Sequence, residues 1–410
     1  MWKIAHVIPV PKLNDLRPLS MLPIFAKVME KVVLKSVMNQ LIDLYGENQF
    51  GFRPSSSTLH AHISIHDYVT RCLDTETTTG VAMISYDMSK AFDRLKHDAL
   101  FQRLQEGHLP RGFLRWIANF LQDRCQQTRI LNTVISSTEA CTSGVPQGSI
   151  IAPYLFAAHM GKLCNDENDS LTVKYADDVL TIVSLDSTTD VQQRLECEIQ
   201  KINSWCVEHG LVLNSNKTKC MIISKARKSP VLQTNFDLPL STELRILGIT
   251  YDTKLSWNVH IKNICKTARQ RMYILRKMKP LVTKTELKSI YHATILNVIE
   301  YCGPLFVGMN KKNQEMIEKI RRRCHHIICG FDCHCNILSS VSERRRTQSM
   351  KLFNEIKKTN NILHHLLPPQ LPRTTHYSMP TCKTNRRLNS FIPFCVNFHN
   401  LTLSRTLSTL

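Results

Sequence analysis

The apolar and polar positions divide the chain into short apolar runs and amphipathic stretches. The run V-A-M-I-S-Y at 81–86 follows Gly80 and is almost wholly apolar, which predicts a buried strand. A second β-prone run, 171–183, is interrupted by the adjacent pair Asp177 and Asp178. Aspartate is a common turn residue, so the pair alone is explained by a hairpin tip.

Helical periodicity predicts helices over 18–45, from the end of the 48–57 loop to about 73, over 111–122 and over 188–208. In the first of these, Ile24, Val28 and Val32 share one face. The turn G-V-P-Q-G at 144–148 precedes a further helix, for which Ser149 is a candidate N-cap.

Residues 253–285 contain nine Lys or Arg and no Asp or Glu. Their apolar positions recur at helical spacing, which predicts an amphipathic helix with a basic outer face that ends at Pro280. The next helix opens with Thr283 and Glu286 in the capping-box pattern. Beyond about 310 the pattern becomes irregular, so we expect a basic, irregular tail.

The charge points to a polyanionic partner. The chain has 53 Lys and Arg against 33 Asp and Glu, a net charge of +20, which favours nucleic acid first and an anionic membrane second. No apolar run approaches the roughly 18 residues of a membrane span, and the N-terminus does not resemble a signal peptide. The 15 scattered cysteines are typical of reduced thiols in an intracellular protein.

Asp87 follows the first predicted strand and lies 90 residues before Asp177. Alone, Asp87 is explained as a helix N-cap after a strand. If the two strands are neighbours in one sheet, however, Asp87, Asp177 and Asp178 converge. Clustered carboxylates repel unless a cation neutralises them, and Mg²⁺ binds through carboxylates together with substrate phosphates. The pattern therefore indicates a two-metal phosphoryl-transfer site.

Several motifs, in this order, resemble the reverse transcriptases of non-LTR (LINE-type, jockey-like) retrotransposons. They are R-P-L-S-M-L-P at 17–23, N-Q-F-G-F-R-P at 48–54, Y-x-D with A-F-D at 86–93, G-V-P-Q-G-S at 144–149, Y-A-D-D at 175–178, L-x-L-N-x-x-K-T at 211–218, and the C-terminal S-F-I-P-F-C-V-N-F-H-N at 390–400. The resemblance implies an α+β right-hand polymerase. Its fingers and palm would span 1–252, with an antiparallel palm sheet covered by helices on one face. A helical thumb would span 253–330 and an irregular basic tail 331–410.

The resemblance also implies an activity: RNA-directed DNA synthesis, in which a DNA 3′-hydroxyl is extended on an RNA template by two Mg²⁺ ions, for which Mn²⁺ may substitute. The implied metal ligands are Asp87, Asp177 and Asp178. The implied general acid is Lys217, with Lys219 as a substitute. The residues implied to bind the incoming nucleotide are Arg17, Lys12, Phe92, Gln147 and Tyr175, where Phe92 would exclude a 2′-hydroxyl.

The implied nucleic-acid contacts are the Leu247-Gly248 primer grip and the thumb residues Lys262, Lys266, Arg269 and Arg276. The partners would be an RNA template, a DNA primer, dNTPs, and an element-encoded RNA-binding protein or upstream endonuclease, with no membrane. Because the chain begins inside the first finger motif, we expect a truncated copy without its endonuclease.

Three alternatives stay open. A catalytically inactive remnant would still bind nucleic acid, and a group II intron-type maturase shares the palm but needs a different thumb. The cluster C-H-H-I-I-C-G-F-D-C-H-C at 324–335 suggests zinc, although its spacing fits neither C-x₂-C pairs nor a zinc knuckle. Backbone binding by the arginines at 321–323 is the favoured interpretation there.

Overall fold

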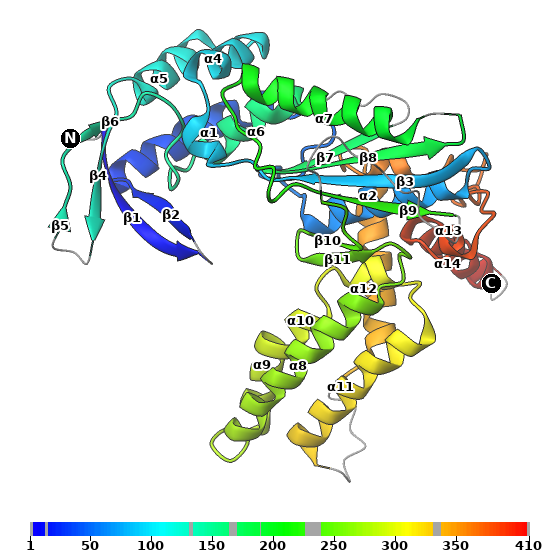
Figure 1. Cartoon of the computed structure of the whole chain (residues 1–410). Helices are drawn as coiled ribbons and strands as arrows, with labels where there is room; N and C mark the ends of the chain where they lie inside the picture. Colours follow the sequence, from blue (N-terminus) through cyan, green and yellow to red (C-terminus); the bar gives the residue numbers. More distant parts are fainter. Residues whose placement is uncertain are drawn as a thin grey trace.

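The computed structural model describes residues 3–12, 15–130, 134–163, 170–188, 190–225, 239–330 and 338–407. It combines helices with three sheets. One sheet lies at the N-terminal side and a second at the centre, and a limb of long helices projects away from the central sheet (Figure 1). No helix in these ranges is long and apolar enough to cross a membrane.

The central sheet has four antiparallel strands in the order β7-β8-β3-β9. The strands are β3 (Thr78–Tyr86), β7 (Ser170–Tyr175), β8 (Asp178–Asp186) and β9 (Lys219–Ser224). The predicted buried strand at 81–86 is confirmed, and the run at 171–183 forms a hairpin whose turn contains Asp177.

Helices cover both faces of this sheet, so the prediction of helices on one face is wrong. Val81 and Met83 of β3 join a core with α2 (Thr58–Asp74), whereas Ala82 and Ile84 join a core with α6 (Ala152–His159) and α7 (Val191–Glu208). Successive strand residues point to opposite faces. A strand that is apolar at every position therefore buries both faces.

The N-terminal sheet contains β1 (Ile4–Lys12), β2 (Asp15–Met21), β4 (Cys125–Ile130), β5 (Val134–Ile135) and β6 (Glu139–Ala140). The helix predicted over 18–45 begins only at Ile24, as α1 (Ile24–Asp43), because residues 18–21 pair with β1. Its predicted common face is exposed: Ile24, Val28 and Val32 are 78%, 55% and 65% accessible. The opposite face, with Leu34, Val37 and Leu41, is buried and joins the core that includes α6.

Helices α3 (Ala91–Arg94), α4 (His97–Glu106) and α5 (Arg111–Leu121) follow β3 and precede β4 in sequence. Beyond the hairpin β10 (Glu243–Ile246) and β11 (Ile249–Asp252), α8 (Asn258–Met278) and α11 (Lys311–Cys329) form the long limb (Figure 1). α8 buries one stripe and exposes its basic residues, as predicted. The Thr283–Glu286 capping box opens α9 (Lys284–Tyr291), also as predicted.

The C-terminal region is not an irregular tail. It contains α12 (Val341–Ile356), α13 (Asn385–Leu388) and α14 (Phe391–Leu407). Phe353, Ile356 and Phe391 belong to the same core as Val81 and Met83 of β3, which we call the main core. Arg344 forms a paired salt bridge with Glu300, at 2.5 and 2.9 Å. Arg387 pairs with Asp67 of α2 at 2.6 Å, and both side chains are buried. These partners are distant in sequence, so helical periodicity did not reveal them. The division into fingers, palm and thumb stays a prediction.

Residues 331–335 of the cysteine–histidine cluster lie outside the described residues. Cys324 is buried on α11 and Cys329 is half-buried at its end. The zinc question is therefore untested at the remaining cysteines.

Candidate active site

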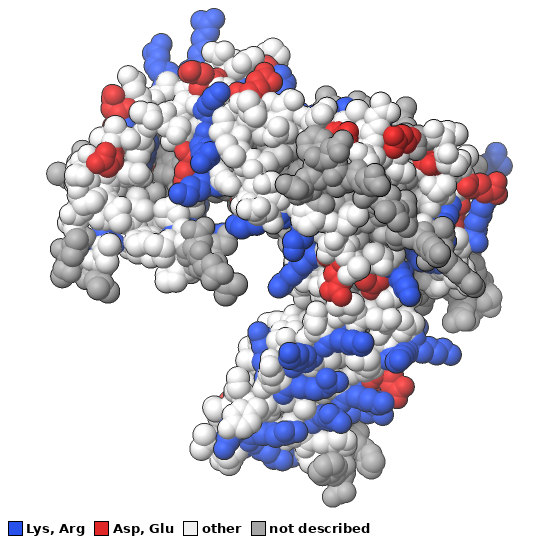
Figure 2. Space-filling model, in the orientation of Figure 1, with Lys and Arg blue, Asp and Glu red and all other residues white. Residues whose placement is uncertain are grey.

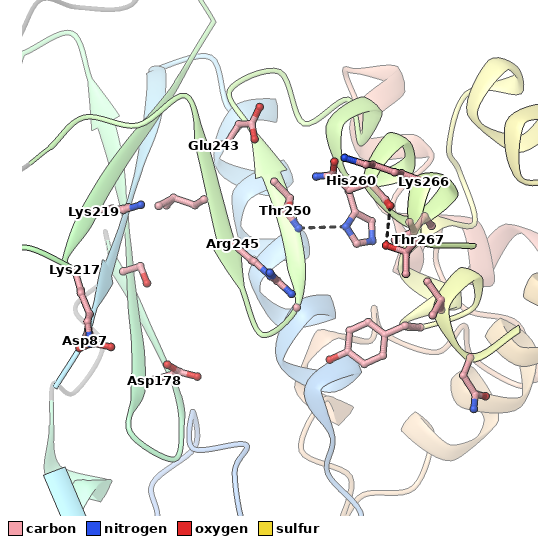
Figure 3. A pocket seen from close by; sticks show the side chains of 18 of the residues that line it. Asp87, Asp178, Lys217, Lys219, Glu243, Arg245, Thr250, His260, Lys266 and Thr267 are labelled. Atoms are coloured by element: carbon pink, nitrogen blue, oxygen red, sulfur yellow. Dashed lines mark hydrogen bonds and ion pairs between the residues drawn. The ribbon is translucent and has the colours of Figure 1, made fainter. Parts of the chain in front are cut away.

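The three predicted carboxylates lie at one end of the central sheet, where β3 ends and β8 begins; we call this end the sheet edge. Tyr86, the last residue of β3, pairs with Val179 of β8, so Asp87 follows beside Asp178 (Figure 3). Asp177 occupies the turn between β7 and β8. Asp177 and Asp178 are exposed, and the Asp87 side chain is 40% accessible. The two strands are thus neighbours, as the sequence argument required.

The loop at 48–54 supports this turn. Phe50 N–H donates to the Lys174 carbonyl at 2.9 Å, and Lys174 N–H donates to the Asn48 carbonyl at 2.8 Å. The buried Gln49 side chain accepts hydrogen bonds from the amides of Gly51 at 3.0 Å and Ala176 at 3.3 Å. Gln49 therefore positions the backbone immediately before Asp177, a function that sequence reasoning missed.

Gly51 makes this close approach possible. A Cβ atom at Gly51 would lie 2.5 Å from the amide nitrogen of Ala176, which is too close for two non-bonded atoms. Ala176 itself has a φ of +57°, a left-handed conformation that is uncommon for residues other than glycine. The tight turn is therefore built against the 48–54 loop rather than by its own sequence alone.

A first cleft, of about 660 Å³, adjoins the carboxylates. Predicted site residues from distant parts of the chain line it: Arg17, Asp87, Phe92, Gln147, Asp177 and Lys217. We call it the small cleft. The structure thus brings together side chains that the motifs had named separately, while their individual functions stay predictions.

Aromatic packing fixes Phe92 in the small cleft. Its ring stacks on Phe156, with centroids 4.2 Å apart, and meets the edge of Phe52 at 6.5 Å. Phe92 and Phe52 both line the cleft. The Phe92 side chain is therefore held on two sides, as a steric filter requires.

Gln147 is oriented by Asp93, whose Oδ1 accepts from Gln147 Nε2 at 2.9 Å. Burial raises the pKa of Asp93, and this hydrogen bond opposes the rise. The Gln147 carbonyl accepts from the Ser20 amide at 2.7 Å, and a Cβ at Gly148 would lie 2.2 Å from the Ser20 carbonyl oxygen. The glycine thus permits β2 to pack directly on the turn at 144–148.

A buried carboxylate anchors the start of α6. Glu30 accepts from the Ser149 hydroxyl and the Ile150 amide, both at 2.6 Å, and from the Ile151 amide at 3.2 Å. The Ser149 hydroxyl in turn accepts from the Ala152 amide at 3.1 Å, but the N-cap position of α6 is Ile151, so the expected N-cap at Ser149 is wrong. Glu30 was missed because its partners lie about 120 residues away in sequence.

A second cleft, of about 1050 Å³, separates the sheet edge from α8; we call it the large cleft. Its lining includes Asp87, Asp178, Lys217, Lys219, Gly248 and Lys266 (Figure 3). Lys217 Nζ lies 3.6 Å from Asp87 Oδ2. The Asn214 amide donates to the Asp87 carbonyl at 2.8 Å, which ties the loop before Lys217 to the sheet edge. Asp87 and Lys217 line both clefts.

Leu247 and Gly248 form a two-residue hairpin turn with φ values of +42° and +87°, as turns matched to strand twist require. The Tyr301 hydroxyl donates to the Leu247 carbonyl at 2.8 Å and lies within hydrogen-bond distance of Thr58 Oγ1, at 2.9 Å. Burial raises the pKa of Tyr301. Tyr301 therefore connects this turn to α2, a link that no local motif indicated.

The predicted basic residues of α8, Lys262, Lys266, Arg269 and Arg276, are all exposed. Basic side chains crowd the limb that contains α8 (Figure 2). The Lys12 side chain lies outside the described residues. Tyr175 is half-buried and packs against the main core, so its predicted contact with substrate stays untested.

The carboxylates at the sheet edge supply oxygen donors, which are the ligands that Mg²⁺ prefers. In the described part of the chain, no three His, Cys, Asp or Glu side chains are arranged closely enough to hold a metal ion by themselves. Mg²⁺ commonly binds through one or two carboxylates and takes its other ligands from substrate phosphates and water. Oxygen donors beside an open cleft suit such an ion.

Comparison with known proteins agrees with the motifs. The family described as "Reverse transcriptase (RNA-dependent DNA polymerase)" matches residues 8–251, more than half of the chain. Among curated relatives, the probable RNA-directed DNA polymerase from transposon BS of Drosophila melanogaster is 23% identical and matches 90% of the chain. The RNA-directed DNA polymerase from mobile element jockey of Drosophila funebris is 24% identical over 93%. The chain spans 44% and 43% of their lengths, respectively.

A solved structure shares the fold. Telomerase from Candida tropicalis, in complex with a fragment of telomeric RNA, superposes with a TM-score of 0.51 at 12% sequence identity. The similarity covers 89% of this chain and 64% of the telomerase chain. It supports a polymerase fold of mixed helices and sheets; pairing among the described strands of this chain is antiparallel except between β1 and β4, which pair in parallel.

Proposed function

The chain belongs to the reverse transcriptase family, and from this premise we propose that it is an RNA-directed DNA polymerase that extends a DNA 3′-hydroxyl on an RNA template. One observation carries the proposal: Asp87, Asp177 and Asp178 share a sheet edge that borders two clefts. One cleft suits a nucleotide, and the other suits a strand.

In this proposal the N-terminal sheet with α1 forms the fingers, the central sheet forms the palm, and the limb of α8 and α11 forms the thumb. The small cleft takes the incoming dNTP. Arg17 pairs with its phosphates, since a guanidinium fork matches phosphate oxygens. Phe92 occupies the space that a 2′-hydroxyl would need, and Gln147 lies against the nucleotide and its template base.

Asp87, Asp177 and Asp178 would hold two Mg²⁺ ions. When bound, such ions stabilise the attacking and leaving oxygens of phosphoryl transfer. In this proposal Lys217 donates a proton to the pyrophosphate; its position beside Asp87 and in the lining of the small cleft supports that function. When a metal ion binds to Asp87, it would replace the Lys217 ammonium as the partner of this carboxylate.

The large cleft takes the RNA–DNA hybrid. The exposed basic face of α8 contacts phosphates without reading sequence, so binding should weaken as salt rises. Gly248 lines this cleft and brings the hairpin backbone close to the primer strand.

Primer extension tests the proposal. Purified protein receives an RNA template, a DNA primer, dNTPs and Mg²⁺ or Mn²⁺, beside an Asp177→Asn variant. We expect extension by the parent protein, loss of nearly all of the rate in the variant, since a metal ligand supplies several kcal/mol of transition-state stabilisation, and loss of extension with EDTA.

No extension by either protein, with salt-sensitive hybrid binding retained, would contradict the proposal. It would favour instead a chain that only binds nucleic acid.

A further inference from the structure

A third cleft, of about 370 Å³, lies at the end of the central sheet opposite the carboxylates. It is enclosed by the end of α2, the start of β3, the end of β8 and the start of α7. Thr78 at this end pairs with Asp186, while Tyr86 at the other end pairs with Val179. At about 3.3 Å per residue, roughly 25 Å of strand separates the two ends. We call it the distal cleft.

Two arginines line the distal cleft, and each shares its carboxylate partner with a second cation. Arg71 Nε lies 2.9 Å from Asp67 Oδ2, but Asp67 Oδ1 is already 2.6 Å from Arg387 Nη1. Two positive charges therefore face one buried carboxylate, so the group of Arg71, Arg387 and Asp67 has a net charge of +1.

The second arginine repeats this arrangement. Arg194 Nη2 lies 3.5 Å from Glu198 Oε1, which is also 3.4 Å from Lys201 Nζ. The acidic residue in the lining, Asp186, accepts hydrogen bonds at 2.9 Å from the Thr188 amide and hydroxyl. Asp186 offsets one of these charges: the four cations named here face three carboxylates, which leaves a net charge of +1 among them.

The remaining polar groups are suited to an anion with several oxygens. Thr77, Thr78 and Ser184 line the cleft together with the arginines. The hydroxyls of Thr78 and Ser184 lie 3.2 Å apart, so one donates to the other and the accepting hydroxyl keeps its own hydrogen for an anion. Lys225 Nζ donates to the carbonyl of Thr75, another residue of the lining. Hydroxyls donate to phosphate oxygens, and the arginine fork binds them in pairs. The cleft has a volume within the range of small-ligand sites.

We propose that the distal cleft binds a backbone phosphate of a single nucleic-acid strand that continues beyond the large cleft. The proposal rests on the proposed function in one respect: the large cleft holds the paired part of that strand. The distal cleft would give the unpaired part a second attachment point, independent of sequence because only phosphates are contacted.

The test compares two substrates and two double variants. A short RNA–DNA hybrid reaches only the large cleft, whereas the same hybrid with an unpaired extension of about 30 nucleotides can also reach the distal cleft. The variant is Arg71→Gln with Arg194→Gln. Its control is Arg111→Gln with Arg115→Gln, which removes the same charge from exposed positions on α5.

We expect the Arg71/Arg194 variant to bind the extended hybrid about tenfold more weakly and the short hybrid as the parent does. The slope of log K against log salt for the extended hybrid should fall by about 0.7 for each single-strand phosphate that the variant no longer neutralises. The control should keep at least most of the affinity for both substrates. Equal binding of the extended hybrid by parent and variant, or an equal loss in the control, overturns the proposal.

Further arms identify the source of the phosphate. RNA and DNA extensions should both bind, because the contact is to phosphate. If inorganic phosphate or a mononucleotide saturates the cleft while an extension adds no affinity, the strand proposal is overturned. Should the double variant fail to fold, Thr77→Glu places a negative charge in the lining without touching either ion pair, and it should weaken only extended-hybrid binding.

This test separates the two proposals. The Arg71/Arg194 variant should extend a primer on the short hybrid at the parent rate. Asp177→Asn should lose extension yet keep the added affinity of the unpaired strand.

Discussion

The small and large clefts share Asp87 and Lys217 but are built differently. In the small cleft the side chains are fixed by packing and hydrogen bonds: Phe92 lies between two rings, and Gln147 is held by Asp93. In the large cleft the lining cation from α8, Lys266, is exposed, and the other predicted cations of α8 are exposed on the helix without being part of the lining. Choosing one nucleotide requires fixed geometry, whereas holding a strand of any sequence requires charge. In the proposed function, the same sheet edge would serve both needs.

The largest effect should come from the residue that the clefts share. Asp87→Asn keeps the shape of the side chain but removes its charge, so we expect turnover to fall by at least about a thousandfold because metal binding is impaired. Hybrid affinity, measured by filter binding, should stay within a few-fold. If the variant kept a tenth of the parent rate, Asp87 would not be an essential metal ligand in the reaction.

Lys217→Ala should have the next largest effect. Loss of a general acid typically costs about a hundredfold or more in the chemical step, so single-turnover extension should slow by that factor at saturating dNTP. Lys219→Ala is the matched control, because Lys219 lines only the large cleft of the two. If Lys219→Ala slowed the reaction more than Lys217→Ala, the assigned donor would be wrong.

The difference between the clefts also explains what the sequence could predict. Asp87 and Asp177 were predicted from strand ends and carboxylate chemistry, and each lies at the strand end or turn that the pattern predicted, whereas Gln147 was implied only by the family resemblance. Gln49 holds the turn before Asp177, Glu30 the start of α6, and Tyr301 the Leu247–Gly248 turn, through partners 127, 121 and 54 residues away. Contacts over such distances leave no periodic signal in a single sequence.

The helices show the same contrast. α5, α7 and α8 were predicted because each buries one stripe of a helix. The C-terminal helices were missed because buried charged side chains and partners distant in sequence hold them. Arg345, for example, is 3% exposed and donates to the Ile299 carbonyl at 3.0 Å. An arginine run suggests a solvated surface until its carboxylate and carbonyl partners are known.

A third prediction sharpens the comparison at the small cleft. Phe92→Ala should leave dNTP extension largely intact and raise the efficiency of rNTP incorporation by roughly tenfold or more, because steric exclusion of a 2′-hydroxyl is removed. The measurement is the ratio of kcat/KM for matched dNTP and rNTP. Phe52→Ala serves as the control, since Phe52 meets Phe92 edge-on in the same cleft. An unchanged ratio in Phe92→Ala would remove the filter function.

The smallest effect should come from the wall of the large cleft. Tyr301→Phe keeps the ring beside Gly248 but removes the hydrogen bonds to the Leu247 carbonyl and to Thr58. Each such bond contributes about 1 kcal/mol, so a less firmly held turn should weaken hybrid binding by about three- to tenfold.

The rate at saturating hybrid should not change, because Tyr301 positions the strand-binding turn and not the reacting groups. Tyr273→Phe, an exposed tyrosine on α8, is the control and should have no effect on either quantity. A fall in the saturated rate without a change in affinity would mean that the Leu247–Gly248 turn acts on the chemistry, and the division of work between the two clefts would then fail.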